Sequence, residues 1–94
     1  MTNYKVSQEA ENDLYRIWLY GLETFGQRQA DSYYDAFFNR FEAIVRSPYQ
    51  YPEADEQSGY RKSVCGADTI YYRIEGETVA IVRVLGRQDV NENL

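Results

Sequence analysis

Histidine is absent from the 94-residue sequence, and cysteine occurs once, at Cys65. Histidine is the usual general base at neutral pH and the commonest metal ligand, so its absence excludes Ser-His-Asp and Cys-His catalysis. A single cysteine permits no intramolecular disulfide and no multi-cysteine zinc site. We therefore expect no metal and no other cofactor, and we assign no catalytic residue.

Long apolar runs are missing too. No segment approaches the roughly 18 consecutive apolar residues that a membrane helix needs, and the first residues lack the apolar run of a signal peptide. The chain has only two prolines, and no linker or repeat divides it. We expect one domain, residues 1–94, located in the cytoplasm and not associated with a membrane.

Positive charge is scarce and unevenly placed. The net charge is −5. Residues 1–59 carry ten acidic and five basic side chains, whereas residues 60–88 carry five basic and three acidic ones. Because phosphate attraction dominates nucleic-acid affinity, we expect no direct nucleic-acid binding. A local arginine cluster could still contact an acidic protein surface.

The spacing of apolar residues predicts two helices in the first half of the chain. Ser7 is a good N-cap residue, and the helix that follows should end at Gly26, where a left-handed residue fits. A second helix should then run to Ser47-Pro48, since proline disfavours helical geometry in the residue before it. Such closely connected helices form an antiparallel hairpin.

Strand patterns flank this hairpin. Residues 3–7 alternate as a short strand, and residues 48–59 form a loop. The second half of the chain has three strand candidates joined by short turns, so we expect them to be antiparallel. They span residues 60–65, 69–75 and 78–85.

The last of these strands has apolar residues on both faces. Simple alternation places Ala80, Val82 and Val84 on one face and Val79, Ile81 and Leu85, with Arg83, on the other. Two helices cover only one face of a sheet. The other face either exposes an apolar patch for a partner or is covered by the 48–59 loop or the C-terminal tail.

Arginines occur inside each of these strands, at Arg61, Arg73 and Arg83. On one face of an antiparallel sheet they could converge and hold carboxylate or phosphate groups. The alternative, which we favour, is that each pairs with a local acid such as Glu75 or is simply solvated.

Other polar and aromatic residues have plain structural interpretations. Cys65 is expected to be a small buried residue. Glu9 and Asp13 suit solvated charges near the positive end of a helix better than an acid–base pair. Tyr49 and Tyr51 have no obvious core role, so they either contact a partner or cover the open edge of the sheet.

Several short motifs occur together in a characteristic order, and together they resemble the RelE/ParE superfamily of type II toxin–antitoxin toxins. The strands resemble the ParE branch in particular. The motifs of the first half are Ser7, Ala10, Asp13, Leu14, Ile17, Trp18 and Tyr20, then Phe25-Gly26, Gln29-Ala30, Tyr33 and Ser47-Pro48. Those of the second half are Gly59 to Lys62, Ile70, Tyr72-Arg73, Ile81 to Leu85, and Arg87 with Asp89.

The resemblance implies an α+β fold, a small β-α-α-β-β-β domain with an antiparallel sheet and the helical hairpin packed on one face. It also implies a bacterial toxin bound by a ParD-like antitoxin, whose C-terminal segment wraps around it. We expect the antitoxin to contact an apolar set of residues: Trp18, Leu22, Val79, Ile81 and Leu85.

The same resemblance implies that DNA gyrase is inhibited without catalysis by the toxin itself. The gyrase contacts are expected at Arg61, Arg73, Arg83 and Arg87. The alternatives are a RelE-type, ribosome-dependent mRNA endoribonuclease and an inactive module that only binds antitoxin. RelE-like toxins commonly use a tyrosine near the C-terminus, and residues 88–94 contain no aromatic or basic residue.

Overall fold

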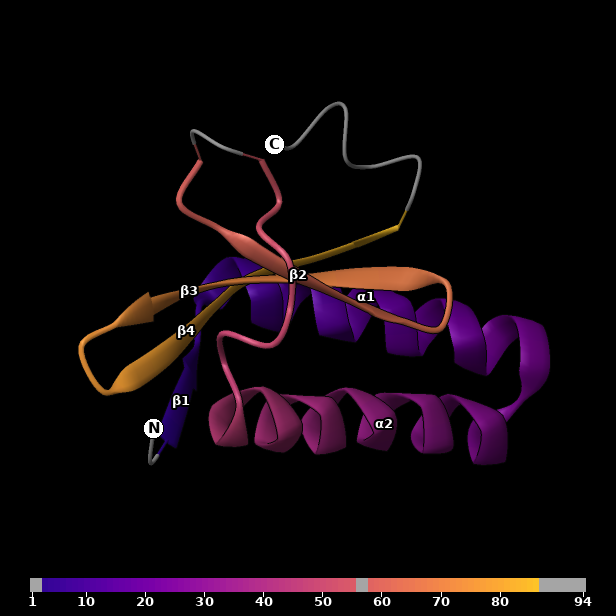
Figure 1. The fold of residues 1–94 in the computed structure, drawn as a ribbon. Helices are drawn as coiled ribbons and strands as arrows, with labels where there is room; N and C mark the ends of the chain where they lie inside the picture. Colours follow the sequence, from indigo (N-terminus) through magenta and orange to yellow (C-terminus); the bar gives the residue numbers. More distant parts are fainter. Residues whose placement is uncertain (1–2, 56–57, 87–94) are drawn as a thin grey trace.

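The computed structural model describes residues 3–55 and 58–86. Two helices lie on one face of a four-stranded sheet (Figure 1). The elements are β1 (Asn3–Val6), α1 (Gln8–Phe25), α2 (Gln27–Arg46), β2 (Arg61–Cys65), β3 (Asp68–Glu75) and β4 (Thr78–Gly86). The predicted α+β fold with β-α-α-β-β-β order is confirmed.

The sheet has the strand order β1-β4-β3-β2. As predicted, β2, β3 and β4 pair antiparallel through short turns. The expectation of an entirely antiparallel sheet needs one correction, because β1 pairs parallel with β4 and the sheet is mixed. The meander leaves one edge of β4 free, and the long connection through both helices allows β1 to occupy it in the parallel direction.

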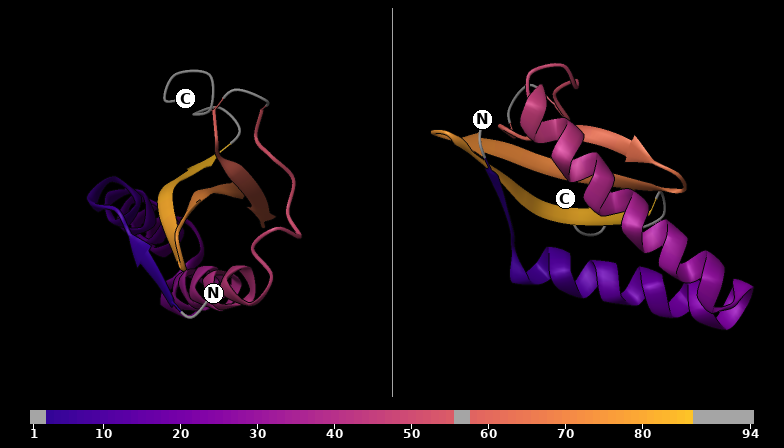
Figure 2. Two further views of the ribbon diagram at one scale, coloured as in Figure 1. Left: turned by 60° about the vertical axis from the view of Figure 1, so that its left-hand side comes forward. Right: turned by 90° about the horizontal axis from the view of Figure 1, so that it is seen from below.

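The two helices begin and end where local chemistry favours it. The Ser7 hydroxyl accepts a hydrogen bond from the Ala10 amide at 3.0 Å and so caps α1. Gly26 then separates the helices with a φ of +95°, a conformation that side chains other than glycine rarely adopt. The result is an antiparallel hairpin, which Figure 2 shows lying against the sheet.

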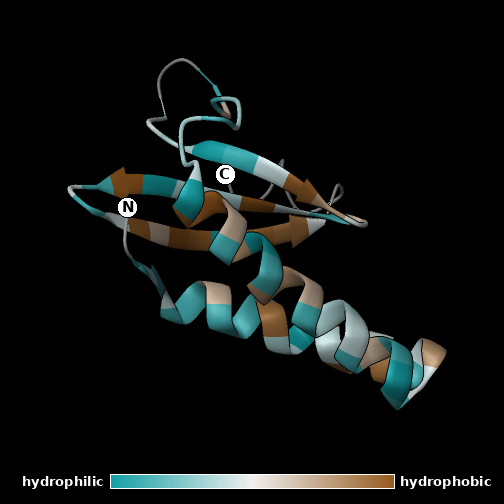
Figure 3. Ribbon diagram, turned by 60° about the horizontal axis from the view of Figure 1, so that its bottom comes forward, coloured by the Kyte–Doolittle hydropathy of each residue, from teal (hydrophilic) through white to brown (hydrophobic). Residues whose placement is uncertain are grey.

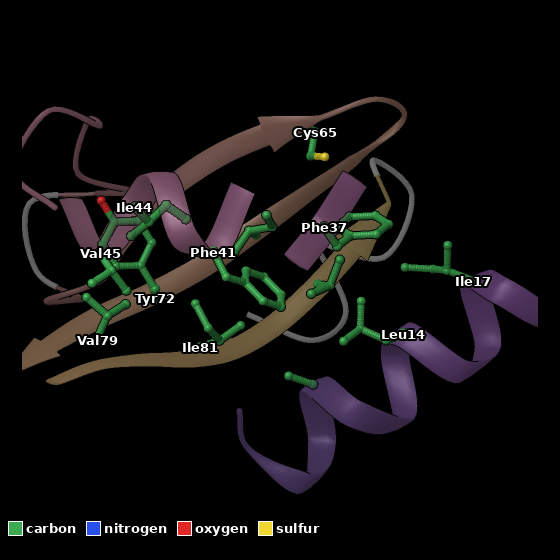
Figure 4. Close-up of a cluster of buried hydrophobic side chains, with 13 residues drawn as sticks. Leu14, Ile17, Phe37, Phe41, Ile44, Val45, Cys65, Tyr72, Val79 and Ile81 are labelled. Atoms are coloured by element: carbon green, nitrogen blue, oxygen red, sulfur yellow. The ribbon is translucent and has the colours of Figure 1, made fainter. Parts of the chain in front are cut away.

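The core lies between this hairpin and the sheet. Phe37, Phe41 and Ile44 of α2 point toward Tyr72 of β3 and Ile81 of β4, and all five are fully buried (Figure 4). Figure 3 shows a long hydrophobic stretch on β4, whereas hydrophobic and hydrophilic residues alternate along β3 and along both helices. The helices therefore pack through one face each, as their periodicity predicts.

The loop after α2 covers the outer edge of β2. Pro52 O accepts a hydrogen bond from the Lys62 amide at 3.0 Å, and Tyr72 donates its hydroxyl proton to Pro48 O at 2.5 Å. The ring of Tyr51 contacts that of Tyr72, with 6.4 Å between centroids. For Tyr51, the edge-covering interpretation is therefore confirmed.

Candidate functional site

A buried carboxylate joins the first helix to the last strand. Asp13 of α1 is 4% exposed and accepts two hydrogen bonds from Arg83 of β4, from Nε at 2.8 Å and from Nη2 at 3.0 Å. It also accepts one from the Val84 amide at 2.9 Å. Arg83 is therefore held in a two-pronged, charge-assisted contact, and the expectation that Asp13 is a solvated charge is wrong.

This contact is one of several side-chain hydrogen bonds to the part of β4 that follows residue 81, where β1 no longer pairs with it. Ser7 donates its hydroxyl proton to Val82 O at 2.9 Å, and Arg16 donates to Val84 O at 3.4 Å. An open strand edge would otherwise invite pairing with another chain. Side chains of Ser7, the N-cap residue of α1, and of Asp13 and Arg16 within α1 satisfy this edge in place of a strand.

A β-bulge in β4 changes which side chains reach each face. Tyr72 pairs with Ile81 and Tyr71 pairs with Arg83, so Val82 has no partner on β3. An extra residue of this kind reverses the alternation beyond it. Val84 consequently lies in the core together with Val79 and Ile81. The expectation that Val79, Ile81 and Leu85 share a face is therefore wrong.

The predicted antitoxin contacts on β4 lie below the surface. Val79 and Ile81 are 0% exposed and Leu85 is 1% exposed. On the sheet face away from the core, Tyr71 and Ala80 are also buried. Beyond residue 60, Val64 is the exposed large apolar residue in the part of the chain that the structure describes. That face does not present the open apolar patch considered from the sequence.

Arg73 and Arg83 on that same face are each paired with an acid. Tyr71 pairs with Lys62 on one side and Arg83 on the other, and Arg73 lies two residues further along β3. Arg73 Nε donates to Glu75 Oε2 at 2.6 Å, and Lys5 Nζ lies 2.8 Å from Glu75 Oε1. These two contacts lower the pKa of Glu75, and the hydrogen bond from Lys5 has the largest effect.

Only two of the predicted arginines share this face. Arg61 pairs across from Tyr72 and so belongs to the core side, where it donates to Tyr51 O at 2.6 Å. Its guanidinium carbon lies 5.1 Å from the ring centre of Tyr49. Arg87 lies outside the described residues, so the predicted convergence reduces to Arg73 and Arg83.

A groove of about 830 Å³ lies between the hairpin, the β2–β3 turn and the end of β4. Its rim carries the rings of Tyr20, Phe25 and Tyr33, and small residues including Gly21 and Ala30 line it. Tyr20 and Phe25 are 64% and 59% exposed and touch edge-on. The sequence gives no sign of this groove, because both rings have the spacing of ordinary members of an amphipathic helix.

Tyr33 fixes the far side of the groove. Its hydroxyl donates to Asp68 Oδ2 at 2.8 Å and accepts from the Ala67 amide at 3.0 Å. Burial, and then the hydrogen bond to Asp68, raise the pKa of Tyr33 far above its ordinary value. The hydroxyl is therefore a positioning group and a poor proton donor to a substrate at neutral pH.

Two of the predicted antitoxin contacts, Trp18 and Leu22, remain partly accessible on α1. They lie two positions along the helix from the groove residues Arg16 and Tyr20, which places them on the other side of it. Trp18 Nε1 donates to Asp31 Oδ1 of α2 at 2.8 Å. Trp18 therefore joins the two helices on the side away from the groove.

Nothing in this arrangement favours nucleophilic or metal chemistry. Cys65 is buried, as predicted, and burial raises the pKa of its thiol, which disfavours the reactive thiolate. Within residues 3–55 and 58–86, no three histidine, cysteine or acidic side chains are grouped to hold a metal ion. The helices of these ranges include none that is long and apolar enough to cross a membrane.

Comparison with known proteins agrees with this fold. The model of the family described as ParE toxin of the type II toxin–antitoxin system parDE matches residues 4–91. Toxin ParE1 of Caulobacter vibrioides is 34% identical over 86 residues, covering 90% of this chain and 88% of that protein. Toxin ParE1 of Mycobacterium tuberculosis is 34% identical over 96 residues, covering 99% and 98%.

Solved structures show the same architecture. The chromosomal ParDE system from P. aeruginosa superposes with a TM-score of 0.81 at 18% identity, covering 92% of this chain and 96% of the other. The toxin–antitoxin complex RelBE2 of Mycobacterium tuberculosis gives 0.67 at 22% identity, covering 90% and 96%. The family model spans almost the whole chain, and the fold matches throughout. This chain belongs to the ParE toxin family of type II toxin–antitoxin systems.

Proposed function

We propose that this toxin is neutralised by a ParD-like antitoxin and that, when free, it inhibits DNA gyrase in the bacterial cytoplasm. The observation that carries the antitoxin part is the groove beside the hairpin. Exposed rings of Tyr20 and Phe25 at the rim of an apolar groove suit a helix or extended segment of another protein. The relatives named as toxins of ParDE systems support a partner of this class.

The groove replaces the buried β4 residues as the proposed antitoxin contact. Tyr20→Ala and Phe25→Ala should weaken antitoxin binding, measured by calorimetry, because aromatic anchors contribute much of the energy of such interfaces. Tyr49→Ala is the matched control, since Tyr49 is 67% exposed and is not among the residues that line the groove. Equal losses in all three variants would argue against the groove.

The proposed gyrase contact is the sheet face that carries Lys62, Arg73 and Arg83. Arg83 is pre-organised there by Asp13, and a rigid guanidinium loses less entropy on binding an acidic surface. We keep Arg73 and Arg83 from the sequence prediction, and Arg87 as an untested part of it. Arg61 is left out because it lies on the core side.

The test is growth after induced expression, with and without the antitoxin, followed by gyrase supercoiling with purified toxin. Growth arrest that antitoxin relieves, together with inhibited supercoiling, supports the proposal. Arrest with normal supercoiling would reject gyrase as the target, and toeprinting would then test mRNA cleavage of the RelE type. Growth without arrest would leave a module that only binds antitoxin.

A further inference from the structure

The edge of the sheet at β2 is closed by a loop and by side chains rather than by another strand. Backbone groups of a strand point alternately to its two neighbours. The Lys62 amide donates to Pro52 O at 3.0 Å, and Tyr60 O accepts from the Ala54 amide at 2.8 Å. Residues 60, 62 and 64 therefore direct their backbone groups away from β3. We call residues 48–54, which supply Pro52 and Ala54 to this edge, the strap.

One arginine holds the strap in place. Arg61 Nη1 donates to Tyr51 O at 2.6 Å, and its guanidinium carbon lies 5.1 Å from the ring centre of Tyr49. Arg61 Nη2 also lies 4.0 Å from Glu53 Oε1. Three residues of the strap therefore contact one guanidinium group, which fixes the strap against the start of β2.

A second arginine closes the other end of the same edge. Arg40 of α2 donates through Nη1 to Val64 O at 2.6 Å and to Ser63 Oγ at 2.7 Å. A hydrogen bond from a charged donor is stronger than one from a neutral donor. Within residues 58–86, the carbonyl of Lys62 and the amide of Val64 remain as the open groups between the two closed positions.

The sequence of β2 suits pairing with a second copy of the chain. An antiparallel pair centred on Ser63 would place Lys62 of each copy opposite Val64 of the other, and Arg61 opposite Cys65. No like charges would then lie directly opposite each other, which would otherwise disfavour the pair. Both Lys62–Val64 pairs would exchange their backbone hydrogen bonds. An uncovered strand edge invites this kind of pairing.

We propose that Arg61, through the strap, and Arg40, through Val64 O, act as gatekeepers that prevent β2 from pairing with a second copy of this chain. The Lys62 amide and the Val64 carbonyl, both needed for that pair, are already bonded within the chain. The pair therefore forms only when both groups are released. This protection belongs to the toxin itself and requires no antitoxin.

Size-exclusion chromatography with light scattering tests the proposal on the purified full chain. Arg40→Ala combined with Arg61→Ala should give a particle of twice the wild-type mass, since both bonded groups of the edge are released. Each single variant should dimerise more weakly. Arg46→Ala combined with Arg73→Ala is the matched control and should keep the wild-type mass. It removes the same charge from α2 and the sheet but leaves the strap and Val64 untouched.

Substitutions of Val64 locate the pairing. Its side chain is 63% exposed, so the single chain should tolerate them. Added to the double variant of Arg40 and Arg61, Val64→Lys should weaken the dimer about tenfold, because like charges would face each other in both Lys62–Val64 pairs. Val64→Glu should strengthen the dimer instead. Amide hydrogen exchange gives a second readout, since the Val64 amide should exchange freely in the wild type and become protected in the dimer.

Four results would overturn the proposal. The first is a folded double variant that keeps the wild-type mass. The second is a dimer that responds equally to Val64→Lys and Val64→Glu. The third is a protected Val64 amide in the wild type, which would show that the edge is already paired. The fourth is equal dimerisation of the control variant, which would assign the effect to lost positive charge.

Circular dichroism checks that each variant folds. If the double variant does not fold, Arg61→Ala alone carries the same Val64 substitutions, because it leaves α2 intact. A folded Arg61→Ala chain whose Lys62 amide stays as protected as in the wild type would show that Arg61 does not hold the strap. The antitoxin groove and the gyrase target play no part in these measurements.

Discussion

Asp13 shows how one residue can connect distant parts of a small domain. It lies on the buried side of α1 between Ala10 and Leu14, and it binds Arg83, seventy positions away in sequence. A carboxylate inside an apolar helical stripe needs a partner, because an unpaired buried charge is very costly. The position of Asp13 within the apolar stripe indicates in the sequence that this carboxylate is buried and paired. That Arg83 is its partner could not be predicted, because the bulge in β4 decides which side chains face α1.

The Arg83–Asp13 pair predicts a large effect on stability. Arg83→Ala should lower the free energy of unfolding by about 3 kcal/mol, because it removes the two-pronged cation from the buried Asp13. The longer contact from Arg16, at 3.5 Å, is then the ion pair that remains to this carboxylate among the described residues. Urea denaturation followed by circular dichroism measures this change. Arg73→Ala removes an arginine from an exposed ion pair and should have little effect on stability. Similar losses in both variants would mean that burial of Asp13 matters little.

Tyr72 predicts how stability responds to alkaline pH. Burial raises the pKa of its hydroxyl to about 12 from the ordinary value of 10.0. The folded protein therefore retains this proton after the unfolded chain has lost it, and the stabilisation present below pH 10 is lost as the pH rises toward 12.

Urea denaturation at a series of alkaline pH values measures this loss. Tyr72→Phe should reduce the slope of stability against pH above pH 10. Some slope should remain, because the pKa values of Tyr4, Tyr33 and Tyr71 are also raised. A wild-type slope in Tyr72→Phe would contradict the assignment.

At the scale of elements, local sequence was sufficient to place every helix and strand of the described ranges within a few residues. Caps, turns and apolar periodicity act over a few neighbouring residues, so they can be recognised without the fold. Two features were not local. The parallel pairing of β1 with β4 and the extra residue at Val82 depend on contacts between the two ends of the chain.

The β2–β3 turn predicts a difference between two glycines with the same backbone geometry. Gly66 and Gly76 have φ values of +63° and +62°, so both disfavour a side chain by about 1 kcal/mol. An added Cβ at Gly66 would lie 2.5 Å from Cε1 of Tyr33, whereas at Gly76 it meets nothing within 4 Å. Gly66→Ala should therefore be the more destabilising variant.

Thermal unfolding of the two variants measures this difference, and the excess loss in Gly66→Ala reports the displacement of Tyr33. Because Tyr33 also forms one side of the groove, antitoxin binding should weaken in Gly66→Ala and remain normal in Gly76→Ala. Identical melting temperatures would show that Tyr33 moves aside without cost.

At the scale of the whole molecule, the fold could be predicted from sequence, but the surfaces could not. The apolar residues on both faces of β4 predict Val79 and Ile81 as partner contacts, but both residues belong to the core. The groove is formed by the two helices, a turn and the end of β4. The groove therefore cannot be recognised from any single segment of the sequence.

The groove also predicts a thermal shift. Antitoxin that binds only the folded toxin should raise the melting temperature, with about 2.7 kcal/mol of added stability at a concentration one hundred times the dissociation constant. Differential scanning calorimetry with increasing antitoxin measures this rise. Phe25→Ala should reduce the rise without changing the melting temperature of the free toxin, as Phe25 is exposed. An undiminished rise would place the antitoxin elsewhere.

The pairing of β1 with β4 affects how the protein matures during synthesis. The first strand has its hydrogen-bonding partner at residues 78–81, and Ser7 and Asp13 bond to residues 82–84. Translation releases β4 after every other element. A nascent toxin therefore remains without its completed sheet until β4 has left the ribosome, and it acquires its binding surfaces only after that point.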